Sequence, residues 1–203
     1  MSNLIRTVIA AALAAGAAGC AAFRARTTEV NVDRPRHQTE KYDYTDMRQI
    51  TEGVAQELLG SAFLAREAEP PVMMIAGVEN RTSQYVDTKN LTDRIRNLTF
   101  QSQRVRYVNE ARREQLMKEQ GYQANNVTPE QRAAIGRQLG AKYMITGSLT
   151  EMRSSSPREV RVSRTKINYY KLTIEVTDLI SGEIVWMTEK EFAREARLPL
   201  IGW

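Results

Sequence analysis

The sequence predicts an α/β (α+β) domain with a mixed central sheet of about four to five strands, an antiparallel C-terminal meander and about four flanking helices. Two observations lead to this class. In the first part of the domain, apolar residues recur at helical spacing and are interrupted by short continuous apolar runs, which are typical of buried strands. From Ala141 onward the apolar period changes to two, which is typical of successive sheet strands.

The first predicted helix starts at Asp46, because Asp46-Met-Arg-Gln49 has the pattern of a capping box. Pro70 and Pro71 end it, since proline cannot continue a helix. Its apolar stripe has helical spacing and consists of Met47, Ile50, Val54, Leu58 and Ala62.

A strand and a second helix follow. The apolar run Val72 to Val78 predicts a strand covered on both faces, and the polar residues Glu79 to Ser83 after it predict a loop. Asp87-Thr88 precedes a second amphipathic pattern, whose apolar stripe consists of Leu91, Ile95 and Leu98.

The sequence pattern in the middle of the chain, from Val105 to Gly140, predicts one short strand and two more helices. Val105 to Val108 is a brief strand, and Asn109 caps a helix that Gly121 ends. Thr128-Pro-Glu-Gln131 combines an N-cap, a proline at the first helical position and a capping-box glutamine. Gly140 closes this second helix.

Three strands complete the predicted sheet. Tyr143 to Leu149 and Tyr170 to Val176 alternate between apolar and polar residues, and Ser181-Gly182 turns the chain into a last strand from Ile184 to Phe192. The polar, arginine-rich stretch Arg153 to Arg164 predicts a long exposed hairpin loop between the first two of these strands.

Residues 1–19 have the pattern of a bacterial signal peptide. Arg6 lies in a short basic region, and the apolar run Val8 to Ala18 is too short to span a bilayer. Ala17-Ala-Gly-Cys20 resembles a lipobox, in which the cysteine thiol takes a diacylglycerol. Cys20 is the only cysteine, so it has no intramolecular disulfide partner, and lipidation accounts for the thiol.

The sequence therefore predicts three parts: a signal peptide (1–19), a lipidated N-terminus and flexible tether (20–45), and a periplasmic domain (46–203). Several acyl chains, at about 0.8 kcal/mol per buried methylene, make a stable anchor. Ala21 follows the cysteine where aspartate favours retention at the inner membrane. We therefore expect the protein to be lipid-anchored on the periplasmic face of the outer membrane.

The formal net charge of +5, from 29 Lys+Arg against 24 Asp+Glu, favours acidic surroundings without naming a partner. Nucleic acid is disfavoured as a partner, because the signal peptide exports the chain and its arginines are scattered. After the signal peptide, no stretch reaches the roughly eighteen consecutive apolar residues that a spanning helix requires.

The residue types for several catalytic sites are missing. The only histidine, His37, lies in the tether and the only cysteine is the lipid site, which excludes a nucleophilic triad or a zinc site. No glycine-rich phosphate loop occurs. We expect no metal, no cofactor and no enzymatic activity. Paired acids of a wall hydrolase stay open as an alternative to caps and turns, namely Glu79, Asp87, Asp178 and Glu183.

Three surface features could form a partner site: the loop Asn80 to Asp87, the loop Arg153 to Arg164, and the apolar tail Leu198 to Trp203. Each has a simpler explanation. The two loops can be solvated connections, and the tail can fold back to bury its large side chains.

Three segments resemble the LpoB family of outer-membrane lipoproteins, which activate a bifunctional class A penicillin-binding protein. The resemblance covers most of residues 46 to 193, and the wider fold is similar to the N-terminal domain of TolB. One departure is Gln103, which stands where relatives usually carry glycine. The matching segments are Val78-Glu-Asn-Arg-Thr82 with Val86-Asp-Thr88, Thr128 to Ala141 leading into Tyr143-Met-Ile-Thr-Gly147, and Ser181-Gly-Glu-Ile-Val-Trp186.

The resemblance implies a monomeric activator that regulates peptidoglycan synthesis by docking on the synthase and binding its active state more tightly. Arginine is favoured at interface hot spots, so the expected contact residues are Arg153, Arg158, Arg161 and Arg164, together with Asn80 and Arg81.

Two other functions stay open. A structural subunit of an outer-membrane secretion or flagellar assembly would form rings in size-exclusion chromatography. A wall hydrolase would degrade purified sacculi on its own.

Overall fold

The computed structural model describes residues 29–34, 37, 39–119, 128–155 and 163–199. The chain divides into two compact units, Met1–Pro35 and Arg36–Trp203. In the first unit, residues 31–34 form a turn in which the Arg34 amide donates to the Asn31 carbonyl. None of the described helices is long and apolar enough to cross a membrane.

The second unit contains a five-stranded sheet with the order β2-β1-β3-β4-β5. Strand β1 runs parallel to β2 and β3, and β3, β4 and β5 form an antiparallel meander, which confirms the predicted mixed sheet. The elements in chain order are α2 (Tyr44–Leu59), α3 (Ala62–Ala65), β1 (Val72–Arg81), α4 (Thr88–Phe100), β2 (Arg106–Tyr107), α5 (Glu110–Glu119), α6 (Pro129–Gln138), β3 (Tyr143–Ser155), β4 (Ser163–Asp178) and β5 (Ile184–Pro199).

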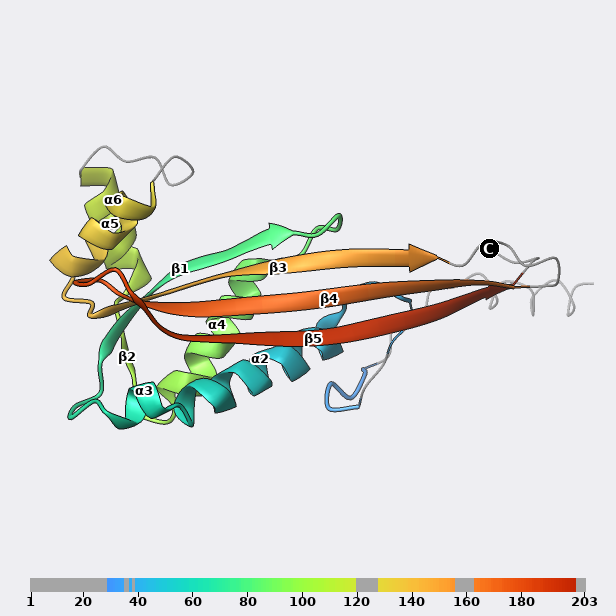
Figure 1. Cartoon of the computed structure of the whole chain (residues 1–203), viewed down its shortest axis with the longest axis horizontal. Coiled ribbons are helices and arrows are strands. Elements are labelled where there is room, and N and C mark those ends of the chain that lie inside the picture. The colour runs from blue at the N-terminus through green and yellow to red at the C-terminus, as the bar shows by residue number, and fades with distance from the viewer. Residues whose placement is uncertain (1–28, 35–36, 38, 120–127, 156–162, 200–203) are drawn as a thin grey trace, which may run out of the picture. The chain divides into compact units, whose positions relative to one another are not determined.

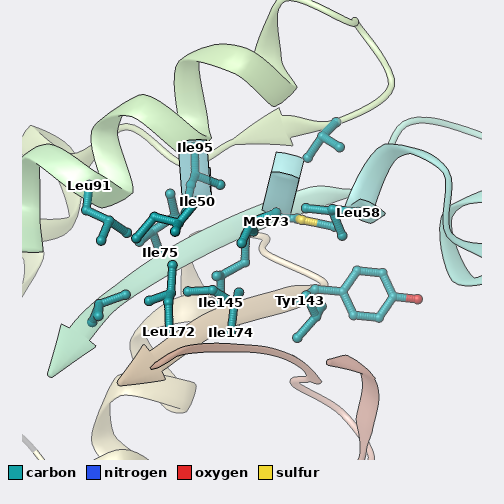
Figure 2. Close-up of a cluster of buried hydrophobic side chains, with 14 of the residues drawn as sticks. Ile50, Leu58, Met73, Ile75, Leu91, Ile95, Tyr143, Ile145, Leu172 and Ile174 are labelled. Atoms are coloured by element: carbon teal, nitrogen blue, oxygen red, sulfur yellow. The ribbon is translucent and has the colours of Figure 1, made fainter. Parts of the chain in front are cut away.

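Helices α2 and α4 cover one face of the sheet, and α5 and α6 lie at one end of the opposite face (Figure 1). The main core fills the space between α2, α4 and the sheet, where alternate strand residues meet the apolar helix stripes. Figure 2 shows this cluster, which includes Leu58, Leu91 and Ile95 from the helices and Met73, Ile145, Leu172 and Ile174 from the strands.

The structure corrects both ends of the first predicted helix. The N-cap of helix α2 lies three positions earlier, at Asp43, and Asp46 occupies the N3 position of the capping box. The helix ends at Leu59, and the amide of its C-cap residue Gly60 donates to the Gln56 carbonyl. Ser61 then caps the separate one-turn helix α3, so the apolar stripe continues across a break rather than through one helix.

Strand β1 also extends further than predicted, through Arg81. Its polar last residues pair in register with β3, so the backbone stays in the sheet although the side chains are exposed. A bulge lies between Ile75 and Gly77, and Gly77 has a φ of 116°, a conformation that favours glycine.

The predicted N-caps of the three later long helices are confirmed. Asp87 caps α4, Asn109 accepts from the first amides of α5, and Thr128 with Gln131 forms the capping box of α6. Gly121, the predicted end of α5, lies outside the described residues, and β2 covers only Arg106 and Tyr107 of the predicted strand Val105 to Val108. Gln103 has a φ of 58°, so it adopts a left-handed conformation that favours glycine.

Candidate partner-binding site

The chain after β1 forms a compact loop that Asn80 shapes. The Asn80 Oδ1 accepts hydrogen bonds from the Thr82 amide at 2.9 Å and hydroxyl at 2.8 Å, and its Nδ2 donates to the Gln84 carbonyl at 2.8 Å. The neighbouring Arg81 pairs with Glu79 at 2.6 Å, and its side chain is 58% exposed. Asn80 is thus a loop-shaping residue, while Arg81 faces solvent.

A buried carboxylate ties this loop to the sheet. The Glu151 side chain on β3 is 3% exposed. Its oxygens accept from the Ser83 amide at 3.0 Å, the Ser83 hydroxyl at 2.7 Å and the Gln84 Nε2 at 3.0 Å. The Arg153 Nε donates to the same carboxylate at 2.9 Å, and the Arg153 guanidinium also donates to the Ser83 hydroxyl. We call Glu151, Ser83, Gln84 and Arg153 the Glu151 cluster.

The cluster keeps Glu151 charged. Burial raises the pKa of the Glu151 carboxyl, but the hydrogen bonds from Ser83 and Arg153 outweigh burial and hold the pKa at about 2. A buried charge is stable only when donors surround it, and here the loop provides most of them. The loop conformation and the charge of Glu151 therefore depend on each other.

The Tyr170 hydroxyl joins the cluster to a second part of the chain. It donates to Glu151 at 3.3 Å and accepts from the Gln84 side-chain amide. It also accepts from the Tyr42 backbone amide at 3.1 Å, just before α2. Three aromatic rings pack around this point, since Tyr42 lies 5.9 Å from Tyr170, which stacks at 5.0 Å on Phe192 of β5.

Exposed side chains surround this rigid network. Tyr85 on the loop is 95% exposed, and the Arg153 side chain, which contacts Ser83 of the same loop, is 55% exposed. On the sheet face opposite the main core, Met152 and Tyr169 are opposite each other in register and are 65% and 41% exposed. A shallow depression here is lined by Thr150, Met152, Tyr169, Lys171, Glu191 and Ala193. Exposed aromatic, Met and Arg side chains are typical of binding surfaces.

Two of the contact residues that the sequence predicts meet at the loop after β1, because Asn80 shapes this loop and Arg153 contacts its Ser83. Arg81 pairs in register with Thr150 of β3, which places it on the other face of the sheet from Arg153.

The structure corrects the predicted loop from Arg153 to Arg164, because β3 continues to Ser155 and β4 starts at Ser163. Arg153 pairs with Asn168 in the sheet, and the Arg164 backbone pairs with Leu198. Long strands pair side by side here although their side chains are polar.

Five predicted features lie wholly or partly outside the described residues. Cys20, Arg158 and Arg161 lie outside entirely, and only the backbone of Arg164 is described. Within the predicted apolar tail, the backbone of Leu198 and Pro199 belongs to β5, and residues 200–203 lie outside.

Glu151 and Tyr170 were not predicted as site residues, and Ser83, Gln84 and Tyr85 were predicted only as part of the loop Asn80 to Asp87. A signal existed for the first two, because the period-two pattern places Glu151 on the face of Leu149 and Tyr170 on the face of Leu172, the core face. A charged residue on that face is unusual and indicates a satisfied polar network.

The acidic residues of the domain act mainly in capping and pairing. Asp178 accepts from the amides of Ile180 and Ser181 in the β4–β5 turn, as its position predicts. His37, Asp43 and Asp46 have ligand-type atoms within 4.8 Å of one another. However, Asp43 caps α2 and Asp46 pairs with Arg194 of β5, so existing contacts account for both carboxylates.

A family model described as peptidoglycan-synthase activator LpoB matches residues 46–192 of the chain. This match includes all of β1 to β4 and the Glu151 cluster. No curated protein sequence matches the chain significantly.

Among solved structures, the C-terminal domain of LpoB from Salmonella enterica superposes with a TM-score of 0.56 at 17% identity, covering 72% of this chain and 98% of that one. The corresponding domain from Escherichia coli gives the same values. The NMR structure of E. coli LpoB has a TM-score of 0.50 at 15% identity, covering 86% of this chain and 85% of that one. These similarities establish a shared fold.

Proposed function

The chain belongs to the LpoB family of peptidoglycan-synthase activators, and on this basis we propose that it binds and activates a bifunctional class A penicillin-binding protein. Members of this family are outer-membrane-associated lipoproteins that partner a penicillin-binding protein and regulate it rather than act as enzymes. The match over residues 46–192 is the observation that carries the proposal. In this proposal, catalysis of glycan synthesis belongs to the partner.

The proposed site of action follows from the N-terminal sequence. A lipidated Cys20 holds the protein at the periplasmic face of the outer membrane, and residues 21–45 give the domain a limited reach. The positive net charge suits the acidic surroundings of membrane and wall. We propose that the protein acts as a monomer, with one domain docking on one synthase.

Activation needs only differential binding. A synthase that exchanges between a less active and a more active state shifts toward the state that the activator binds more tightly. A tenfold preference corresponds to about 1.4 kcal/mol, which a few well-placed side chains provide. A rigid surface suits this role, because it does not have to be ordered when the complex forms.

The docking surface that we propose centres on Tyr85 and includes two exposed arginines, Arg81 at the end of β1 and Arg153, which contacts Ser83 of the same loop. Hydrogen bonds from Ser83 and Gln84 to the Glu151 carboxylate hold the loop that carries Tyr85 in place. A large, exposed aromatic side chain on a fixed loop has the properties of an interface anchor. Arg158, Arg161 and Arg164 follow Arg153 along the chain, and we propose that they extend this surface.

A binding experiment tests the proposal. The full-length lipoprotein in detergent is mixed with each purified class A penicillin-binding protein of the same organism, and complex formation is measured by analytical ultracentrifugation. We expect a one-to-one complex with one synthase. Ring-sized self-association without synthase binding would contradict the proposal and would favour an assembly subunit instead.

A further inference from the structure

We propose that residues 40–43, where the chain enters the domain, fix the conformation of the Ser83–Tyr85 loop, with Tyr42 as the positioning residue. The family match begins at residue 46, so this entry segment lies outside the part by which the family is recognised. The loop-fixing role stands independently of the proposed function. Its consequence for docking rests on that function.

The entry segment packs against β4 and β5 through specific contacts. The Asn168 side-chain amide donates to the Glu40 carbonyl at 3.2 Å, and Lys166 pairs with the Glu40 carboxylate at 3.8 Å. The Tyr42 ring packs against Tyr170 and Phe192, with ring centroids 5.9 and 6.2 Å apart. Polar contacts and ring packing thus hold a segment that the sequence assigns to the flexible tether.

A short chain of hydrogen bonds, which we call the relay, connects the entry segment to the loop. The Tyr42 backbone amide donates to the Tyr170 hydroxyl at 3.1 Å. That hydroxyl contacts the Gln84 side-chain amide and donates to Glu151 at 3.3 Å. Glu151 in turn accepts from the Ser83 amide at 3.0 Å. The Tyr170 hydroxyl also accepts a longer hydrogen bond from the Asn168 side-chain amide, at 3.4 Å. We expect that loss of the Tyr42 contact leaves the hydroxyl less firmly oriented, which weakens its contacts with both Gln84 and Glu151.

Two parts of Tyr42 contribute to the relay, its ring and its backbone amide. The Tyr42 hydroxyl is buried without a hydrogen-bond partner among the described residues. The variant Tyr42→Phe therefore keeps the ring and the amide and removes a group that makes no bond. Tyr42→Ala removes the ring that seats the amide against Tyr170, so the two variants separate positioning from general effects of substitution.

Amide hydrogen exchange measured by NMR on the full-length chain in detergent tests the inference directly. We expect Tyr42→Ala to speed exchange of the Ser83 amide about tenfold or more, while amides of α6 and of the β3–β4 centre keep their rates. Tyr42→Phe should leave the Ser83 rate unchanged. Equal acceleration at Ser83 and throughout the sheet would show general destabilisation and would overturn the inference.

A double-mutant cycle that combines Tyr42→Ala with Gln84→Ala gives a second, independent test. Gln84→Ala cuts the relay on the loop side, so its effect on Ser83 exchange should be smaller in the Tyr42→Ala background than in the wild type. Full additivity would overturn the relay. With a synthase that binds, Tyr42→Ala should weaken binding and Tyr42→Phe should not. If no synthase binds the wild type, the proposed function fails, while the exchange result still decides the positioning role.

Discussion

The Tyr170 hydroxyl lies 3.3 Å from a carboxylate oxygen of Glu151, and the two residues face each other across β3 and β4 on the core side of the sheet. This pair is the point at which the loop after β1, the two central strands and the segment before α2 meet. A buried charge that several elements must jointly satisfy favours one arrangement of those elements over others. The domain therefore presents its exposed loop from a fixed base.

Replacing Glu151 by Gln should destabilise the domain by about 1–3 kcal/mol at neutral pH, because charge-assisted hydrogen bonds from the loop are lost. The folded-state pKa of Glu151, at about 2, lies below its ordinary value of 4.5. The stabilisation is therefore fully present above about pH 4.5 and is lost as the pH falls toward 2. Urea unfolding at pH 7 and pH 3 checks this.

The matched control for Glu151 is Glu191→Gln, an exposed carboxylate on β5. Its effect on the free energy of unfolding should stay within about 0.5 kcal/mol at both pH values. A Glu151→Gln effect that is the same at pH 7 and pH 3 would contradict the assigned role of the charge.

Replacing Arg194 by Met should cost about 3 kcal/mol, because it leaves the fully buried carboxylate of Asp46 without its cation. Burial already raises the pKa of Asp46, against the hydrogen bond from Arg194. Since a raised pKa makes protonation easier, the cost of Arg194→Met should shrink as the pH falls. Thermal or urea unfolding of both proteins between pH 7 and pH 4 gives the comparison.

Arg197→Met serves as the control, because Arg197 is 78% exposed and pairs with Glu195 on the surface. Its effect should be below about 1 kcal/mol. Equal effects of the two arginine substitutions would show that the Asp46–Arg194 pair is not a special contact.

Much of the secondary structure could be predicted from the sequence, because caps and periodicity are local. Thr128 and Gln131 lie three positions apart, and their capping box appears as predicted. The end of α2 was harder to predict from the sequence. Ala62 continues the apolar spacing although the helix has already ended before Gly60. The candidate site could be predicted only in part. Ser83 and Glu151 lie 68 positions apart, and only the folded sheet brings them together.

Replacing Tyr85 by Ala should lower the affinity for the synthase at least tenfold without changing stability, because the side chain is 95% exposed. Biolayer interferometry, in which the synthase is titrated onto immobilised full-length protein in detergent, measures the affinity. Phe100→Ala is the control, as Phe100 is also exposed, at 57%, but lies at the end of α4. A loss of binding with Phe100→Ala but not with Tyr85→Ala would place the docking surface elsewhere.

Replacing Cys20 by Ser should abolish incorporation of labelled palmitate and release the protein from the membrane fraction, since this thiol is the predicted site of the acyl anchor. Sucrose-gradient fractionation distinguishes outer from inner membrane for the wild type. As a control, Ser2→Ala changes a residue near the start of the predicted signal peptide and should leave labelling intact. Palmitate labelling of the Cys20→Ser variant would refute the anchor.

The most direct measurement is glycan-strand synthesis from lipid II by each purified class A penicillin-binding protein of the same organism, with and without the full-length protein. We expect a several-fold rise in rate with one synthase, and a smaller rise when the added protein carries Tyr85→Ala. Unchanged rates with every synthase, together with no binding to any of them, would contradict this expectation.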